Sequence, residues 1–160
     1  MFPPTTQDDA EAVEPTIERD RIALGIRQPW IELILRGHKR LEIRTQPTNV
    51  RGTIYLYASK TIATIPEAGA AIRTHGIEWD ASHAQTLVGS VDIVGCRPAR
   101  PDEAADVAGS CLSADALRDR YAWELARPVR YASPLRPRFL PYGVWFYPFR
   151  RRASASHRPR

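Results

Sequence analysis

The sequence lacks several features that would assign it to a class at once. No apolar run reaches about 18 residues, so no membrane span is expected, and the first 20 residues do not resemble a secretory signal. Only two cysteines occur in 160 residues, Cys96 and Cys111, and they lie far apart without metal-ligand spacing. We interpret them as reduced thiols, which favours a cytoplasmic protein. The four histidines show no paired spacing either, so neither a metal nor a cofactor is expected.

Lysine is also scarce, because all but two of the 23 basic residues are arginine, the exceptions being Lys39 and Lys60. Residues 1–20 carry six acids and one base, whereas residues 150–160 carry five arginines and no acid. We therefore predict a disordered acidic leader at 1–20, a folded domain at 21–149 and a disordered basic tail at 150–160. The folded part keeps a net charge of +5. This favours an anionic partner, most commonly nucleic acid, although an arginine-biased composition would look the same.

The hydrophobic pattern predicts short strands with helices between them. Hydrophobic residues make up 43% of the chain, enough for a core. Strands are expected at 21–26, 40–44, 52–58, 87–96, 121–131 and 142–149, and helices at 28–36, within 62–75 and within 101–120. Gly37 is a natural stop for the first helix. This order predicts an α+β fold, a small mixed β-barrel with short flanking helices.

The segment 37–44 concentrates charge on one strand face. Glu42 and Arg44 lie two residues apart and share a face, opposite Leu41 and Ile43. Lys39 has the wrong parity and joins them only if it lies on the turn after Gly37. Arg44 would then offer a planar fork of donors to a phosphate or carboxylate. The alternative is a surface ladder of ion pairs with little energetic value.

Two further segments follow predicted strands and carry candidate ligand groups. Arg27 and Gln28 precede a helix, where backbone donors attract anions. Ser59 and Lys60 follow the strand at 52–58, and we interpret Ser59 as a cap for the next helix and Lys60 as a phosphate contact.

Tyr121 and Trp123 share one face of a strand. Aromatic side chains beside basic groups suit stacking on a nucleobase, but they suit a barrel core equally well.

Taken in order, these segments closely resemble the ASCH domain family, whose signature is Gly-x-Lys-x-x-Glu-x-Arg. Here the signature is carried by Gly37, Lys39, Glu42 and Arg44. The supporting segments are 24–30, 51–60, 88–94, 121–125 and 143–146, and the resemblance covers about residues 21–149.

The resemblance implies a PUA-like β-barrel with a cleft that binds RNA, another single-stranded nucleic acid or a modified nucleotide. The implied ligand-binding residues are Arg27, Gln28, Lys39, Glu42, Arg44, Ser59, Lys60, Tyr121 and Trp123. Some small members of the family resemble amidohydrolases that act on acylated cytidine and carry threonine where this chain has Glu42. Glu42 cannot replace that hydroxyl nucleophile, although it could activate water as a general base.

Three hypotheses follow from the sequence. The first is a binding module that reads RNA or a modified nucleotide in the cleft. The second is an enzyme on the same cleft, a hydrolase of a modified nucleoside or a ribonuclease, with Lys39 and Glu42 as candidate catalytic residues. The third is an interaction protein whose basic tail finds the partner.

Overall fold

One six-stranded sheet organises the protein, with the strand order β2-β5-β4-β3-β1-β6. The computed structural model describes residues 11–105 and 113–151, so Cys111, residues 1–10 of the predicted leader and residues 152–160 of the predicted tail lie outside it. The strands are β1 (Ala23–Ile26), β2 (Leu41–Arg44), β3 (Gly52–Ala58), β4 (Leu87–Pro98), β5 (Tyr121–Leu135) and β6 (Trp145–Phe146). The helices are α1 (Trp30–Leu35), α2 (Pro66–His75) and α3 (Ala114–Leu117), with 3-10 turns η1 (Ala81–His83) and η2 (Pro101–Ala105).

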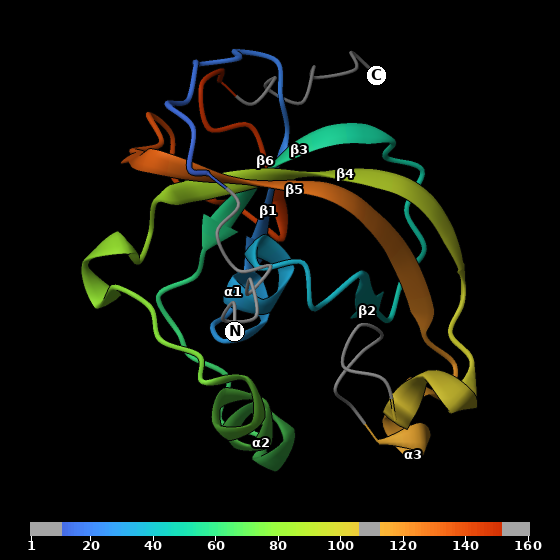
Figure 1. Cartoon of the computed structure of the whole chain (residues 1–160). Coiled ribbons are helices and arrows are strands. Elements are labelled where there is room, and N and C mark those ends of the chain that lie inside the picture. The colour runs from blue at the N-terminus through green and yellow to red at the C-terminus, as the bar shows by residue number, and fades with distance from the viewer. Residues whose placement is uncertain (1–10, 106–112, 152–160) are drawn as a thin grey trace, which may run out of the picture.

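The sheet curls into a half-barrel, as Figure 1 shows, with β4 and β5 arching over α1. The strands β1 and β3 are parallel, and the other neighbouring pairs are antiparallel. Shifts of register between β4 and β5 interrupt their long ladder, and such irregularities bend and twist strands. The predicted α+β fold, a small mixed β-barrel with short flanking helices, is thereby confirmed, and its sheet forms a half-barrel.

Most predicted elements are present, with differences at their ends. The helix predicted within 62–75 begins at Pro66, whose missing N–H is tolerated in a first helical turn. The strand predicted at 142–149 is only the two-residue β6. The carbonyl of Pro148 accepts hydrogen bonds from the N–H groups of Arg138 and Phe139, at 2.9 and 3.0 Å, so the chain folds back instead of extending the sheet.

The core lies on both faces of the sheet. On the concave face α1 packs against β1, β3 and β4 through Ile31, Ile34 and Leu35. A side chain at Gly89 would approach the carbonyl oxygen of Val129 to 2.2 Å and Leu35 to 2.5 Å, so glycine is required there for α1 to sit this close. On the other face a second cluster gathers Ala23, Tyr55, Tyr57, Leu87, Tyr131 and Phe146.

Part of the segment assigned to the acidic leader contacts the domain. The N–H of Val13 donates to the carbonyl of Arg130 at 3.0 Å, and the carbonyl of Val13 accepts from Ala132 at 2.8 Å. The hydroxyl of Tyr55 accepts a hydrogen bond from the N–H of Glu18 at 2.7 Å. Residues 13–18 therefore lie against the sheet.

Residues 11–105 and 113–151 include no helix with the length and apolar character needed to cross a membrane.

Candidate functional site

The edge strand β2 turns its charged face toward the inside of the half-barrel. Leu41 and Ile43 point outward, where they pack with Leu117 and Ala122 in a small cluster of their own. The opposite face carries Glu42 and Arg44, as the alternation predicted. The apolar side of β2 thus serves a satellite cluster, and its charges face the concave side of the sheet.

Lys39 reaches these charges from the turn after α1, as expected. Gly37 ends the helix with φ at +77°, and the N–H groups of His38 and Lys39 both bond to the carbonyl of Leu33. The Lys39 ammonium donates to the carbonyl of Leu41 and lies 3.6 Å from Oε2 of Glu42. Lys39 and Glu42 are only 4% and 7% exposed, so the interpretation as a surface ladder is wrong.

Arg44 connects β2 to the far side of the sheet. Its Nε donates to Oε1 of Glu42 at 2.9 Å, and its Nη2 donates to the carbonyl of Gly25 in β1 at 3.1 Å. The guanidinium also lies 5.7 Å from the ring centroid of Trp123. Because β1 and β2 are separated by three strands in the sheet order, this side chain spans the mouth of the half-barrel.

Arg44 forms part of a cleft of about 600 Å³ between β1, β2 and the segment before β6. We call it the cleft. Its lining comprises Gly25, Ile26, Arg27, Trp30, Glu42, Ile43, Arg44, Thr45, Tyr57, Ser59, Arg120, Pro141, Gly143 and Val144. The structure therefore brings four of the predicted residues together there: Arg27, Glu42, Arg44 and Ser59.

The cleft combines cations with aromatic side chains. The guanidinium groups of Arg27, Arg44 and Arg120 line it together with Trp30 and Tyr57. Burial raises the pKa of the Tyr57 hydroxyl, while a hydrogen bond with Gln85 lowers it by less. The hydroxyl is thus engaged by Gln85, and the ring is buried and packs edge-on against Phe146, with 5.1 Å between the ring centroids.

Three predicted residues lie behind the cleft rather than in its lining. Lys39 supports Glu42 from below. Trp123 is 3% exposed, and its Nε1 donates to the carbonyl of Gln46 at 3.0 Å. Its ring stacks on that of Trp145, with 5.5 Å between the ring centroids. Tyr121, opposite Arg44 in the β2–β5 register, is half-buried against the main core. For this aromatic pair the core alternative describes the observed packing.

Gln28 and Lys60 line a different, smaller cavity, and Ser59 borders both that cavity and the cleft. The prediction that Ser59 caps the following helix is wrong, because α2 begins at Pro66 with Ile65 in the capping position. The chain needs six more residues to reach the helix, which leaves Ser59 at the end of β3 facing the site.

Sequence reasoning missed several lining residues. Tyr57 lies on the face of β3 opposite Ile54 and Leu56, but that face is also buried in a core cluster, so the alternation alone does not mark it as a lining residue. Arg120 directly precedes β5 but stands among other charged residues, and nothing local distinguishes it. Val144 enters through the irregular segment before β6.

No group of three or more His, Cys, Asp or Glu side chains within residues 11–105 and 113–151 is placed to hold a metal ion. Cys96 is a half-buried free thiol.

Comparison with known proteins gives one family and one fold. The family model described as the ASCH domain matches residues 24–134. The crystal structure of a serine-to-alanine variant of ZmASCH from Zymomonas mobilis aligns with a TM-score of 0.51 and 15% identity, covering 81% of this chain and 88% of that one. ZmASCH itself aligns with a TM-score of 0.48 and 16% identity, covering 81% and 88%. None of the curated proteins matches this chain.

Proposed function

The chain belongs to the ASCH domain family, and we propose that its cleft binds one unpaired nucleotide of an RNA or other single-stranded nucleic acid. The observation that carries the proposal is the placement of Arg44. Its fork of donors is held at the mouth of the cleft by Glu42 and by the carbonyl of Gly25. A guanidinium fixed in this way is prepared for a phosphate, because little conformational freedom remains to be lost on binding.

The size and lining of the cleft support a nucleotide as the ligand. Its volume of about 600 Å³ lies within the range of about 300–1,000 Å³ typical of small-molecule sites. Arg27 and Arg120 add positive charge for a phosphate, and the half-buried Trp30 offers aromatic surface for a base. A single unstacked nucleotide fits such a site, whereas a base inside a duplex has its faces covered.

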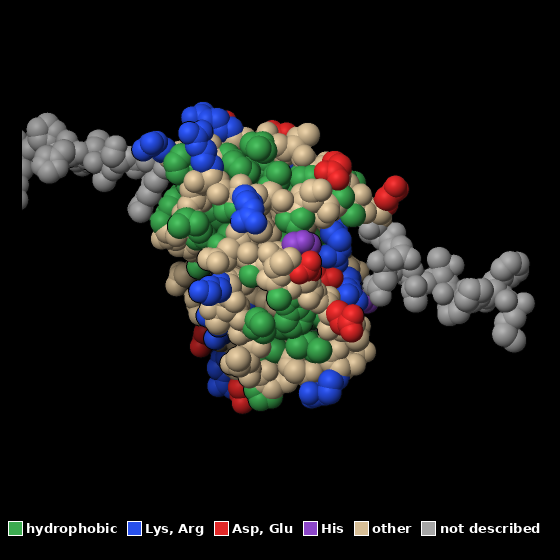
Figure 2. Space-filling model, turned by 90° about the vertical axis from the view of Figure 1, so that its left-hand side faces the viewer, with side chains coloured by type: hydrophobic (Ala, Val, Ile, Leu, Met, Phe, Trp, Pro, Cys, Tyr) green, Lys and Arg blue, Asp and Glu red, His purple; other side chains and the backbone are tan. Residues whose placement is uncertain are grey.

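The face of the molecule drawn in Figure 2 offers no basic track for a nucleic-acid backbone. Figure 2 shows one face on which Lys and Arg side chains are scattered among apolar and acidic ones, with no continuous basic stripe. On this proposal, binding depends on a few defined cations and less on net charge.

Catalysis by Lys39 and Glu42 has less support from the geometry. Both oxygens of Glu42 already face cations, Arg44 at 2.9 Å and Lys39 at 3.6 Å. Lys39 is buried and is not among the side chains that line the cleft. These contacts suit positioning of Arg44 better than abstraction of a proton, so we propose a reader rather than a hydrolase or ribonuclease. A cytoplasmic setting is part of the proposal and rests on the small number of cysteines.

The proposal is tested by measuring dissociation constants for one RNA sequence in single-stranded and fully paired form. The single strand is expected to bind at least about tenfold more tightly, because the duplex must first unstack and unpair a base. Equal affinity for the two forms would contradict recognition in the cleft.

A further inference from the structure

A second hollow lies next to the cleft, with Ser59 on the border between them. It consists of a cavity of about 90 Å³ and an adjoining one of about 300 Å³. The two share four lining residues, Gln28, Trp79, Asp80 and His83, and we call them together the rear groove. None of these four residues lines the cleft.

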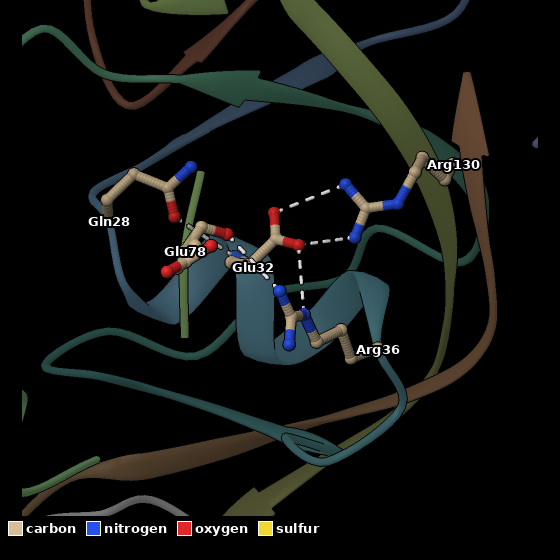
Figure 3. Close-up of polar contacts among 5 residues, drawn as sticks. All are labelled: Gln28, Glu32, Arg36, Glu78 and Arg130. Atoms are coloured by element: carbon tan, nitrogen blue, oxygen red, sulfur yellow. Dashed lines mark hydrogen bonds and ion pairs between the residues drawn. The ribbon is translucent and has the colours of Figure 1, made fainter. Parts of the chain in front are cut away.

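Gln28 presents an oriented donor to the rear groove. Its side chain is only 8% exposed, and its Oε1 accepts a hydrogen bond from the N–H of Glu32 at 3.3 Å. In Figure 3 the amide nitrogen consequently points away from Glu32. Within residues 11–105 and 113–151 this nitrogen has no acceptor.

The surroundings of Nε2 of Gln28 show where this atom is accessible. Every fully enclosed side-chain nitrogen or oxygen of the described residues has a partner, so Nε2 of Gln28 must open onto the groove. A donor that is held in one orientation and opens onto the groove is available to an acceptor on a ligand.

The surroundings hold Gln28 in place. The carboxylate of Glu32 accepts hydrogen bonds from Nε of Arg36 at 3.1 Å and from both terminal nitrogens of Arg130 (Figure 3). Arg36 also donates to the carbonyl of Glu78, at 3.2 Å. This network ties the first turn of α1 to β5. It therefore holds Glu32, whose N–H orients the Gln28 amide.

Trp79 supplies an aromatic wall. The indole is half-buried and packs on Leu33, Ala71 and Ile77, and it lines both parts of the rear groove. Lys60, exposed at the end of β3, lines the smaller cavity. An aromatic wall, a directed amide donor and a nearby cation are the groups that proteins use to bind an unpaired base and its phosphate.

A cationic ligand fits this groove less well. Glu32 is neutralised by two arginines, and Asp80 accepts hydrogen bonds from both the N–H and the hydroxyl of Ser82. His83 lies 3.6 Å from the other oxygen of Asp80. Two of the three acids that line the groove are thus engaged, and the third, Glu78, has an exposed side chain. The Gln28 donor remains available to a ligand.

We propose that the rear groove binds the nucleobase adjacent to the nucleotide in the cleft. The nucleic-acid chain would cross between the two sites at Ser59. Trp79 stacks on that base, and Nε2 of Gln28 donates to a carbonyl oxygen or ring nitrogen on its edge. This inference rests on the proposed function, since the cleft must hold the neighbouring nucleotide.

The test compares a mononucleotide with the corresponding dinucleotide, by calorimetric titration of the full chain. The wild type is expected to bind the dinucleotide at least about tenfold more tightly, as for one additional stacked base. Gln28→Met and Trp79→Ala should each remove most of that gain while leaving mononucleotide affinity unchanged. Trp79→Phe, which keeps an aromatic face, is the matched control and should retain most of the gain.

Two results would overturn the rear groove alone. One is a wild type that binds the mononucleotide and gains nothing from the second nucleotide. The other is a set of variants that lower mononucleotide and dinucleotide affinity by the same factor while melting at the wild-type temperature. If neither ligand binds the wild type, the proposed function fails as well. Because Gln28 and Trp79 lie on different segments, misfolding of one variant leaves the other as a test.

Discussion

The side chain of Arg44, on β2, donates a hydrogen bond to the carbonyl oxygen of Gly25, on β1, across 3.1 Å. Three strands separate β1 from β2 in the sheet, so the contact links two sides of the half-barrel that the backbone ladder leaves unpaired. The same guanidinium is paired with Glu42. The family motif therefore both closes the mouth of the sheet and furnishes the cleft with an oriented cation.

If the cleft is a reader, prolonged incubation of the protein with oligonucleotides and modified nucleosides should release no new product. Both oxygens of Glu42 are engaged by cations, which leaves no carboxylate free to activate water. Mass spectrometry of the incubated mixture checks this, because it detects both retention and turnover. A product that forms with the wild type and disappears with Glu42→Gln would support the enzymatic alternative instead.

Binding should depend only moderately on salt. Three arginines line the cleft, Arg27, Arg44 and Arg120. If each contacts one phosphate of a single strand, the logarithm of the affinity should fall against the logarithm of the salt concentration with a slope of about −2. A slope steeper than about −5 would require many more cations and would argue for the arginine-rich tail as the binding element.

Glu32→Gln should destabilise the fold. The Glu32 carboxylate is almost fully buried and holds two arginines, one of them 98 residues away on β5. The loss should cost about 2 kcal/mol, less than for a fully buried pair, because the side chains of Arg36 and Arg130 are 20% and 35% exposed and water can solvate them. Urea denaturation measures the free energy of unfolding.

Arg118→Ala is the control for Glu32→Gln, because Arg118 forms an exposed ion pair with Asp115. Removal of such a pair should change the unfolding free energy by at most about 0.5 kcal/mol. Equal effects of the two substitutions would show that the Glu32 network contributes no more than a surface pair.

Asp92 should make stability depend on pH on the acid side. A hydrogen bond from the Thr53 hydroxyl lowers the pKa of the Asp92 carboxyl, and the ion pair with Arg127 adds to this against the opposing effect of burial. Because the folded state has the lower pKa, this stabilisation is present above the unfolded pKa and is lost as pH falls through the folded value.

Asp92→Asn should therefore be less stable than the wild type at pH 7, with a difference that shrinks below about pH 4. Denaturation curves at several pH values measure this. Thr53→Val, which removes the largest cause of the shift, should reduce the pH dependence in the same direction. A difference that stays constant from pH 7 to pH 3 would show that the Asp92 carboxyl is not the source.

Much of the local structure could be predicted because it depends on local pattern. The alternation in β3, the stop at Gly37 and the shared face of Glu42 and Arg44 all follow from the sequence alone. The turn position of Lys39 followed from the family motif, and its contact with Glu42 then required only a short turn.

What could not be predicted depends on distant partners. The outward apolar face of β2 has its own cluster with Leu117, 74 residues beyond Ile43, and nothing near Ile43 indicates this. Arg27 and Gln28 are neighbours in the chain but face different hollows, because the segment between β1 and α1 is irregular and follows no period. The carbonyl of Gly25 became part of the site only through the curl of the whole sheet.

The measurement that tests the central claim most directly is the affinity of a labelled single-stranded RNA for four forms of the chain. These are the wild type, Arg44→Ala, Arg51→Ala and a form that lacks residues 152–160. Arg51 is exposed at the opposite end of β3 from Ser59, away from the cleft. Arg51→Ala therefore removes one arginine, as Arg44→Ala does, without changing the cleft. Arg44→Ala is predicted to weaken binding at least about tenfold, as for the loss of a charge-assisted phosphate contact, while Arg51→Ala and the truncation change it less than about threefold. Wild-type affinity in Arg44→Ala together with loss of binding on truncation would contradict the cleft as the nucleic-acid site.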